Sequence, residues 1–194
     1  MKPCIPTLAA LALAPGAHAE LSSLYAGIAY ERLNSDSADL DAVVVTGGFD
    51  LNSFLGVEMS AAAGVRGDDA RIDATMDSGG AVISPSVDLD YSLNSRFDLV
   101  GLAKLQLTER MRLTARAGIS RYDVETRASY GATGTAPAVV LVNQHDGIGF
   151  VAGLGGGYEF MPDTSLTVAY TYYDEQGGSG GPADGVRLGL KRRF

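Results

Sequence analysis

The sequence predicts an all-β protein, an eight-stranded antiparallel up-and-down transmembrane β-barrel. Apolar and polar residues alternate along eight segments, which is typical of strands with one apolar and one polar face. No apolar run approaches the roughly 20 residues of a spanning helix, so a membrane chain of this composition must close into a barrel. The connections alternate between short turns and long loops, as they do in membrane barrels.

The N-terminal residues have the features of a secretory signal peptide. Lys2 supplies a positive charge, residues 5–15 form a short apolar stretch, and Ala17-His18-Ala19 is an A-x-A cleavage site. The sequence therefore predicts a signal peptide at residues 1–19 and a single barrel domain at residues 20–194.

Composition restricts the function classes. The chain has 15 Lys and Arg against 23 Asp and Glu. Without the leader, whose only charge is Lys2, 14 basic and 23 acidic residues remain, a balance of −9. This balance argues against nucleic acid, which requires a basic face. Cys4 is the only cysteine, so the mature chain would have no disulfide and no thiol chemistry.

The first three strands are predicted at residues 21–33, 40–51 and 54–66. A polar loop at residues 34–39 separates the first two, and a tight turn at Asn52-Ser53 separates the second and third. Each strand carries apolar side chains at every second position. The alternation therefore gives each strand an apolar face opposite a polar or small one.

The fourth and fifth strands are predicted at residues 87–108 and 111–124, with a short turn at Glu109-Arg110. The fourth has the cleanest alternation. We assign its apolar side chains, Leu89, Tyr91, Leu93, Phe97, Leu99, Leu105 and Leu107, to a single face. Its polar side chains, Asp88, Asp90, Asn94, Arg96, Asp98, Lys104 and Gln106, would share the other face.

Two long loops are predicted, at residues 67–86 and 125–146. The first contains Asp68, Asp69, Asp73 and Asp77. Clustered carboxylates can bind calcium, but their spacing matches no EF-hand, and we favour a solvated acidic loop over a metal site. The second contains an apolar run at residues 138–142, which could extend a strand or cover the loop.

The last three strands are predicted at residues 147–160, 165–173 and 186–194. A turn at residues 161–164 and a flexible loop at residues 174–184 connect them. With eight strands both chain ends lie on the side of the short turns. The first and last strands can then pair and close the barrel.

Alternation alone leaves two polarities open. A soluble barrel of the lipocalin type would direct its apolar face inward around a hydrophobic ligand. Here the polar face carries many glycines and small residues, which suit the narrow interior of an eight-stranded barrel. Aromatic residues beside the short turns would form an interfacial girdle: Phe49, Phe54, Tyr158, Phe160 and Phe194. We therefore favour the lipid-facing polarity.

With that polarity, ten charged side chains point into the lumen: Glu31, Asp50, Glu58, Asp98, Lys104, Arg112, Arg116, Glu159, Arg187 and Lys191. Charges there need partners, because a buried unpaired charge is costly. They could form a salt-bridge network that plugs the barrel, or a gated path for ions. We favour the plug and keep a small ion or solute channel as the second function class.

Several motifs resemble the small outer-membrane β-barrel family, which includes the transmembrane domain of OmpA. They are L-Y-A-G-I-A-Y-E at residues 24–31, L-T-A-R-A-G-I at 113–119, G-G-G-Y-E-F at 155–160, S-L-T-V-A-Y-T-Y at 165–172 and the terminal L-G-L-K-R-R-F. The resemblance covers the mature chain and implies a multi-pass barrel in a Gram-negative outer membrane. In this family the terminal aromatic, here Phe194, is the signal read by the assembly machinery. Arg192, at an outward site, departs from the usual apolar pattern.

The resemblance implies a structural, envelope-integrity or adhesin-like surface-interaction role through the extracellular loops. The expected partners are outer-membrane lipids and lipopolysaccharide, the outer-membrane assembly machinery, and a host or cell-surface molecule at the loops. We expect a monomer that needs no cofactor and no metal.

Some barrels of this size modify lipid A with a Ser/His pair, so an enzyme is the third class. His145 is the only histidine of the mature chain and stands beside Asp146, with Ser120 or Ser129 as distant nucleophile candidates. Adjacent strand residues point to opposite faces, which gives the His-Asp pair poor geometry. We predict a protein that is not an enzyme and has no catalytic residues.

Overall fold

The computed structural model describes residues 24–35, 38–73, 76–78, 81–83, 86–130, 139–174 and 181–194. Its elements are all strands: β1 (Leu24–Ser35), β2 (Asp39–Asp50), β3 (Leu55–Arg66), β4 (Asp68–Asp73), β5 (Met76–Ser78), β6 (Ala81–Ile83), β7 (Ser86–Gln106), β8 (Met111–Tyr130), β9 (Val139–Met161), β10 (Thr164–Tyr173) and β11 (Ala183–Arg193). Among these residues no helix is long and apolar enough to span a membrane.

Eight of these strands close into an antiparallel barrel, as the sequence predicts. The order around the barrel is β3-β2-β1-β11-β10-β9-β8-β7, and β3 pairs with β7 to complete the circle. The first and last strands pair from Tyr25↔Arg193 to Ser35↔Ala183. Closure gives every spanning strand two neighbours, so its backbone polar groups are satisfied without water. The short turns mark the periplasmic end, where both described chain ends lie.

The apolar side chains face outward, which excludes the lipocalin polarity. Ile28, Phe97 and Leu154 are 56%, 57% and 68% exposed. The five predicted girdle residues are also exposed, and they lie beside the short turns and at the chain end. Such a surface is stable only against lipid, since water would disfavour so much exposed apolar area.

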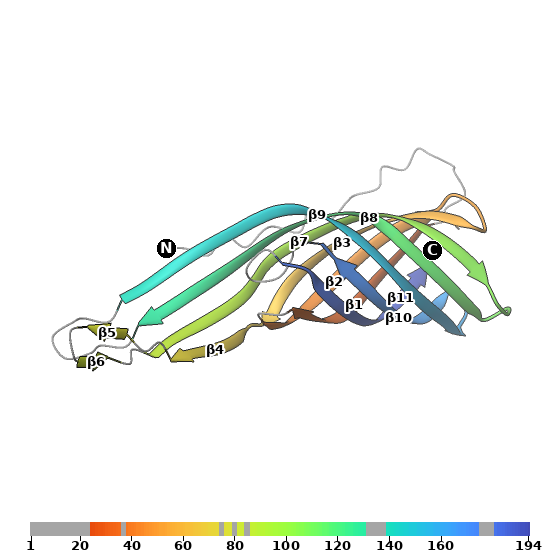
Figure 1. Ribbon diagram of the computed structural model, residues 1–194. Helices are drawn as coiled ribbons and strands as arrows, with labels where there is room; N and C mark the ends of the chain where they lie inside the picture. Colours follow the sequence, from red (N-terminus) through yellow and green to blue (C-terminus); the bar gives the residue numbers. More distant parts are fainter. Residues whose placement is uncertain are drawn as a thin grey trace.

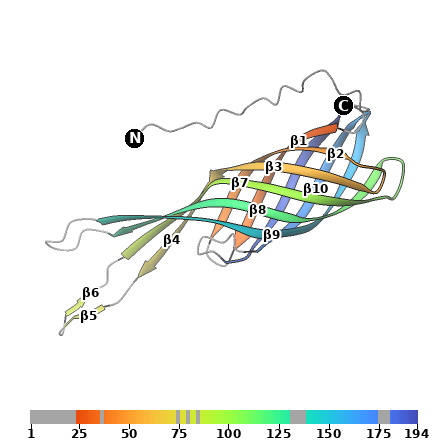
Figure 2. The ribbon, with the colours of Figure 1, turned by 90° about the horizontal axis from the view of Figure 1, so that it is seen from above.

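Three strands are much longer than a membrane crossing requires. β7, β8 and β9 have 21, 20 and 23 residues, against 10 and 11 for β10 and β11. Figures 1 and 2 show the ends of β7, β8 and β9 projecting with β4 far beyond the barrel. We call this projection the protruding sheet: β4, residues 86–91 of β7, 126–130 of β8 and 139–143 of β9. It lies on the extracellular side, opposite the short turns.

The prediction of two long loops was therefore wrong in part. The first contains β4, β5 and β6, and most of the second is strand, because β8 and β9 pair without interruption as far as Tyr130↔Val139. The apolar run extends β9 over Val139, Val140, Leu141 and Val142, while Ala138 lies outside the described residues. Cross-strand pairing continues there because β-branched residues suit a pleated sheet.

A β-bulge in β7 changes which side chains face the lumen. The register with β8 shifts between Leu93 and Ser95, so Asn94 is the extra residue. On the extracellular side of the bulge Leu93 is buried and Tyr91 packs against the core, whereas Phe97 beyond it faces outward. Placing Leu93 and Tyr91 on one face with Phe97 was wrong, because a single inserted residue reverses the phase of alternation.

Candidate functional site

The middle of the lumen holds a charge cluster centred on Glu31 of β1. Its carboxylate accepts hydrogen bonds from Nη2 of Arg96, from Nη2 of Arg187 at 3.3 Å and from the Tyr173 hydroxyl at 2.8 Å. Arg187 Nη2 also donates to the Tyr173 hydroxyl at 3.1 Å. None of these side chains is more than 6% exposed. The barrel thus satisfies the buried carboxylate from three other strands.

Asp98 of β7 completes this central charge cluster. It forms ion pairs with Arg96 Nε at 3.2 Å and with Arg187 Nη2 at 3.5 Å. The hydroxyls of Ser60 and Ser120 donate to its two oxygens at 2.9 and 2.7 Å. The Arg96 guanidinium also lies 4.3 Å from the centre of the Tyr173 ring, a favourable cation–π distance. Two arginines and two carboxylates balance in charge, which makes their burial tolerable.

An apolar layer closes the lumen on the extracellular side of the central charge cluster. It lies two to four residues further along the strands and consists of Leu33, Leu40, Leu93, Tyr122 and Val124, none more than 5% exposed. We call these five residues the apolar cap. Because water and ions avoid a packed apolar layer, this cap opposes a continuous aqueous path at this level.

A second charge group lies nearer the periplasm, around Glu58 of β3. Its two oxygens accept hydrogen bonds from Arg116 Nη2 at 2.7 Å, from Lys191 Nζ at 2.9 Å and from the Tyr25 hydroxyl at 3.1 Å. Lys191 Nζ also lies 4.1 Å from the centre of the Tyr25 ring. Gly48 makes room for that tyrosine, because an added Cβ would lie 2.4 Å from the Tyr25 hydroxyl oxygen.

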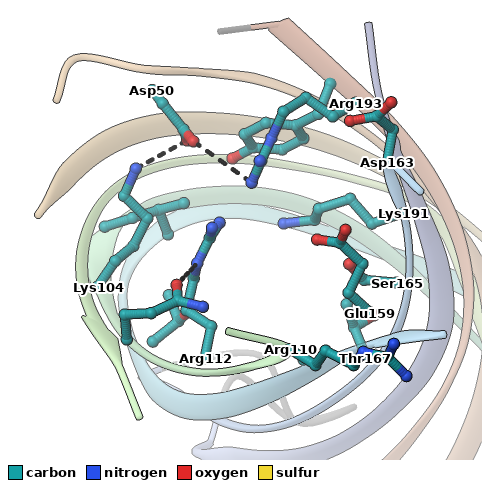
Figure 3. A pocket seen from close by; sticks show the side chains of 15 residues that line it. Asp50, Lys104, Arg110, Arg112, Glu159, Asp163, Ser165, Thr167, Lys191 and Arg193 are labelled. Atoms are coloured by element: carbon teal, nitrogen blue, oxygen red, sulfur yellow. Dashed lines mark hydrogen bonds and ion pairs between the residues drawn. The ribbon is translucent and has the colours of Figure 1, made fainter. Parts of the chain in front are cut away.

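The periplasmic mouth contains a third group and an open cavity (Figure 3). Asp50 pairs with Lys104 Nζ at 2.8 Å and with Arg193 Nη2 at 3.9 Å. Lys104 also donates to the carbonyl oxygen of Asn52 at 3.0 Å. Arg112 Nε donates to Gln106 Oε1 at 3.0 Å. The cavity among these side chains measures about 70 Å³.

All ten charged residues expected in the lumen have buried or half-buried side chains on the inner face. Eight belong to the three ion-paired groups described above. Arg112 and Glu159 differ, since neither has an ion pair among the described residues. Sequence reasoning omitted Arg96, Arg193, Tyr25 and Tyr173 from the network. Each lies in phase with a polar face, which was the available signal, but an aromatic ring in that phase does not by itself indicate a hydroxyl that bonds to a carboxylate.

The candidate catalytic residues do not meet. His145 faces Val124 on β8, and its ring centre lies 6.2 Å from that of Tyr122. Ser120 and Ser129 stand four and five residues from Val124, which at about 3.3 Å per residue separates each from His145 by more than roughly 13 Å. Ser120 also donates its hydroxyl to Asp98. Neither Ser120 nor Ser129 therefore forms a Ser/His pair with His145.

Much of the acidic segment forms strand, in β4 and β5. Asp68 accepts from the backbone N–H of Asp39 at 3.0 Å, and Asp69 faces Asp90 across the β4–β7 pairing. A hydrogen bond and charge repulsion from Asp90 raise the pKa of Asp69. The side chains of Asp73 and Asp77 lie outside the described residues. No three His, Cys, Asp or Glu side chains in the described part are placed to hold a metal ion.

Comparison with known proteins identifies the family. Residues 5–194 match the model of the outer membrane protein β-barrel domain. Similar solved structures include OprG of Pseudomonas aeruginosa (11% identity, TM-score 0.56, covering 89% of this chain and 96% of that one). They also include neisserial NspA (14%, 0.51, 88% and 96%) and Ail of Yersinia pestis (14%, 0.50, 89% and 97%). No curated protein sequence matches. At these identities the structural likeness shows the fold alone, whereas the family model covers nearly the whole sequence. The chain belongs to the outer membrane protein β-barrel domain family, and it is a multi-pass protein of the Gram-negative outer membrane.

Proposed function

We propose that this outer-membrane protein is a non-enzymatic surface-interaction protein whose protruding sheet binds a partner outside the cell. The barrel serves as an anchor in this proposal. Its lumen is blocked by the central charge cluster and the apolar cap, which argues against a solute channel. The separation of His145 from Ser120 and Ser129 argues against a lipid A-modifying enzyme that uses His145.

The free edge of β9 is the observation that carries the proposal. β10 pairs with β9 only as far as Val151↔Tyr173. Among the described residues, positions 139–149 of β9 therefore have a neighbour on one side alone, namely β8. An exposed row of backbone N–H and C=O groups is a template for a strand from another chain.

The side chains of this edge favour contact with a protein. Val140, Leu141 and Val142 are 60%, 55% and 56% exposed at the far end of the protruding sheet. That end lies well beyond the barrel (Figure 2), so a membrane around the barrel would not cover it. Exposed apolar residues beside unpaired backbone groups suit a partner that adds an extended segment and covers them. Ail, named for attachment and invasion, is a barrel of similar fold.

Three parts of the barrel surface suit its remaining proposed partners: the apolar outer wall, the extracellular rim and the end of the last strand. The exposed apolar wall and the girdle would contact outer-membrane lipids. Arg32, Arg66 and Arg121 are exposed near the extracellular rim, where guanidinium groups could pair with lipopolysaccharide phosphates. Phe194, 61% exposed at the end of the last strand, would be presented to the assembly machinery.

A proline substitution tests strand addition without disturbing the β8–β9 pairing. The Asp174 N–H donates to Phe150 O across the β10 side, so even-numbered residues of β9 direct their backbone groups toward the free edge. Val142→Pro therefore removes an outward N–H, while Val142→Ala trims the side chain and keeps that donor. Cells that display each variant would be tested for adhesion to epithelial cells and to immobilised matrix proteins.

We expect the wild type and Val142→Ala to adhere and Val142→Pro to lose most adhesion, with equal amounts of folded barrel at the surface. Equal adhesion of Val142→Pro and wild type would refute strand addition at this edge. Equal adhesion of cells with and without the protein would refute the surface-interaction function itself.

A further inference from the structure

We propose that the periplasmic mouth of the lumen is a binding site for a small water-soluble anion that carries a carboxylate or phosphate group. The site goes beyond the surface function and faces the other side of the membrane. Five cations and three carboxylates line the cavity, a local balance of +2: Lys104, Arg110, Arg112, Lys191 and Arg193 against Asp50, Glu159 and Asp163. The whole chain carries −8. A positive recess in an acidic protein concentrates anions.

Arg112 is an inner-face cation of this cavity that has no ion pair among the described residues. Asp50 engages Lys104 and Arg193, and Glu58, deeper in the lumen, engages Lys191. Among the described residues no carboxylate lies within ion-pair distance of Arg112, whose Nε donates to the neutral Gln106. Figure 3 shows Arg112 among the side chains that surround the opening. Its remaining N–H groups could bind an oxyanion in the two-pronged geometry that guanidinium favours.

The charge of Glu159 should lower the affinity of the site for anions. It lines the same cavity and also has no ion pair among the described residues. Its negative charge opposes the entry of an anion. The structure therefore assigns opposite effects to two residues of one cavity, since removing Arg112 should weaken anion binding and removing the charge of Glu159 should strengthen it.

Size and access define the ligand. A cavity of about 70 Å³ accommodates a phosphate-sized group or a few waters, and not a folded partner. The central charge cluster and the apolar cap close the lumen above it, so the ligand enters from the periplasm. Apart from Arg110 and Asp163, which are exposed in the short turns, the charged lining side chains are buried or half-buried on the inner face of the barrel. This placement favours a water-soluble anion over a lipid headgroup.

The test is a titration of inorganic phosphate into the folded protein in phosphatidylcholine nanodiscs. The arginine Nε–Hε signals would be followed by NMR. We expect a saturable shift of the Arg112 signal, and a shift of the same signal with acetate. In Arg112→Gln, the signals of the remaining arginines would report phosphate binding. This substitution should weaken phosphate binding by about tenfold or more. Glu159→Gln should tighten binding.

Arg192→Gln is the matched control. Arg192 lies on the same strand as Lys191 and Arg193 but is exposed on the outer face, so its substitution should leave the affinity unchanged. A linear, non-saturating response would overturn the proposal, as would equal weakening by Arg192→Gln or weakening by Glu159→Gln. The same Arg112 shift in phosphatidylglycerol discs without phosphate would assign the site to a lipid headgroup and overturn the water-soluble ligand.

Discussion

Glu31→Gln is the sharpest perturbation of the central charge cluster. Arg96, Arg187 and Tyr173 all donate to the Glu31 carboxylate inside the barrel. Glutamine keeps the shape of the side chain and one acceptor oxygen but removes the negative charge. Two buried guanidinium groups would then face the single carboxylate of Asp98, and the apolar cap covers them on the extracellular side.

The expected cost follows from the distances. At 3.3 Å the pair of Glu31 and Arg187 is worth about 5 kcal/mol at an effective dielectric constant of about 20, and the Arg96 pair contributes at least as much. Burying the Glu31 charge itself costs several kcal/mol, which the substitution recovers. The net loss in free energy of unfolding should therefore be about 3–5 kcal/mol, the usual result of removing one partner from a buried pair.

The assay is urea unfolding of the protein after refolding in phospholipid vesicles. The folded fraction is measured by the heat-dependent gel shift. Glu159→Gln is the control, because Glu159 is half-buried and has no ion pair among the residues that the structure describes. It should change stability by about 0.5 kcal/mol or less. Combining Glu31→Gln with Arg96→Gln restores charge balance and should cost less than the sum of the single changes. A loss under about 1 kcal/mol for Glu31→Gln would refute a stabilising role for the cluster.

Three further predictions concern packing, pH and assembly. Gly185→Ala would place a Cβ 2.7 Å from the Glu31 carboxylate, so urea unfolding should show a loss of about 1–3 kcal/mol, while Gly47→Ala, with nothing within 4 Å, should be neutral. Similar losses for both would contradict the packing argument. Because Asp90 raises the pKa of Asp69, the β4–β7 pairing should be most stable below the ordinary carboxylate pKa and should weaken as pH rises through the raised one. Asp69→Asn should therefore slow amide exchange in β4 relative to wild type at pH 7, and equal exchange there would count against the repulsion. Phe194→Ala should reduce barrel assembly in cells while leaving refolding into vesicles unchanged, since the backbone N–H of residue 194 still donates to Leu24 O; normal assembly in cells would show that the ring is not the signal.

The alternation of residue types predicted most of the barrel but not its irregular positions. Ile28, Leu154 and Tyr170 face outward, as their place in the pattern indicates. The residue pattern gives no sign of the bulge at Asn94, because the sequence on each side of Asn94 fits a strand with either face turned outward. The extension of β8 and β9 was missed for a related reason. Polar residues outside the membrane need not alternate, so strand and loop look alike in one sequence.

The charge groups show a similar division. Glu31 and Arg187 were expected in the lumen from their phase alone. Their partnership with Tyr173 was not foreseeable, since that tyrosine stands 142 positions from Glu31 in the chain. Which buried groups meet depends on the stagger between neighbouring strands and on the closure of the circle. Neither the stagger nor the closure can be deduced from the sequence of a single strand.

The sequence by itself determined the outward apolar surface, the even number of barrel strands and the strand faces, except where the bulge in β7 reverses them. The physical reason is that side chains alternate with a strict period of two, so composition at every second position decides which face meets lipid. Only the tertiary structure decided which residues meet in the central charge cluster and the apolar cap. It also decided that, among the described residues, β9 keeps a free edge and Arg112 has no ion pair. These features arise from register and closure, which set the height of each side chain around the barrel.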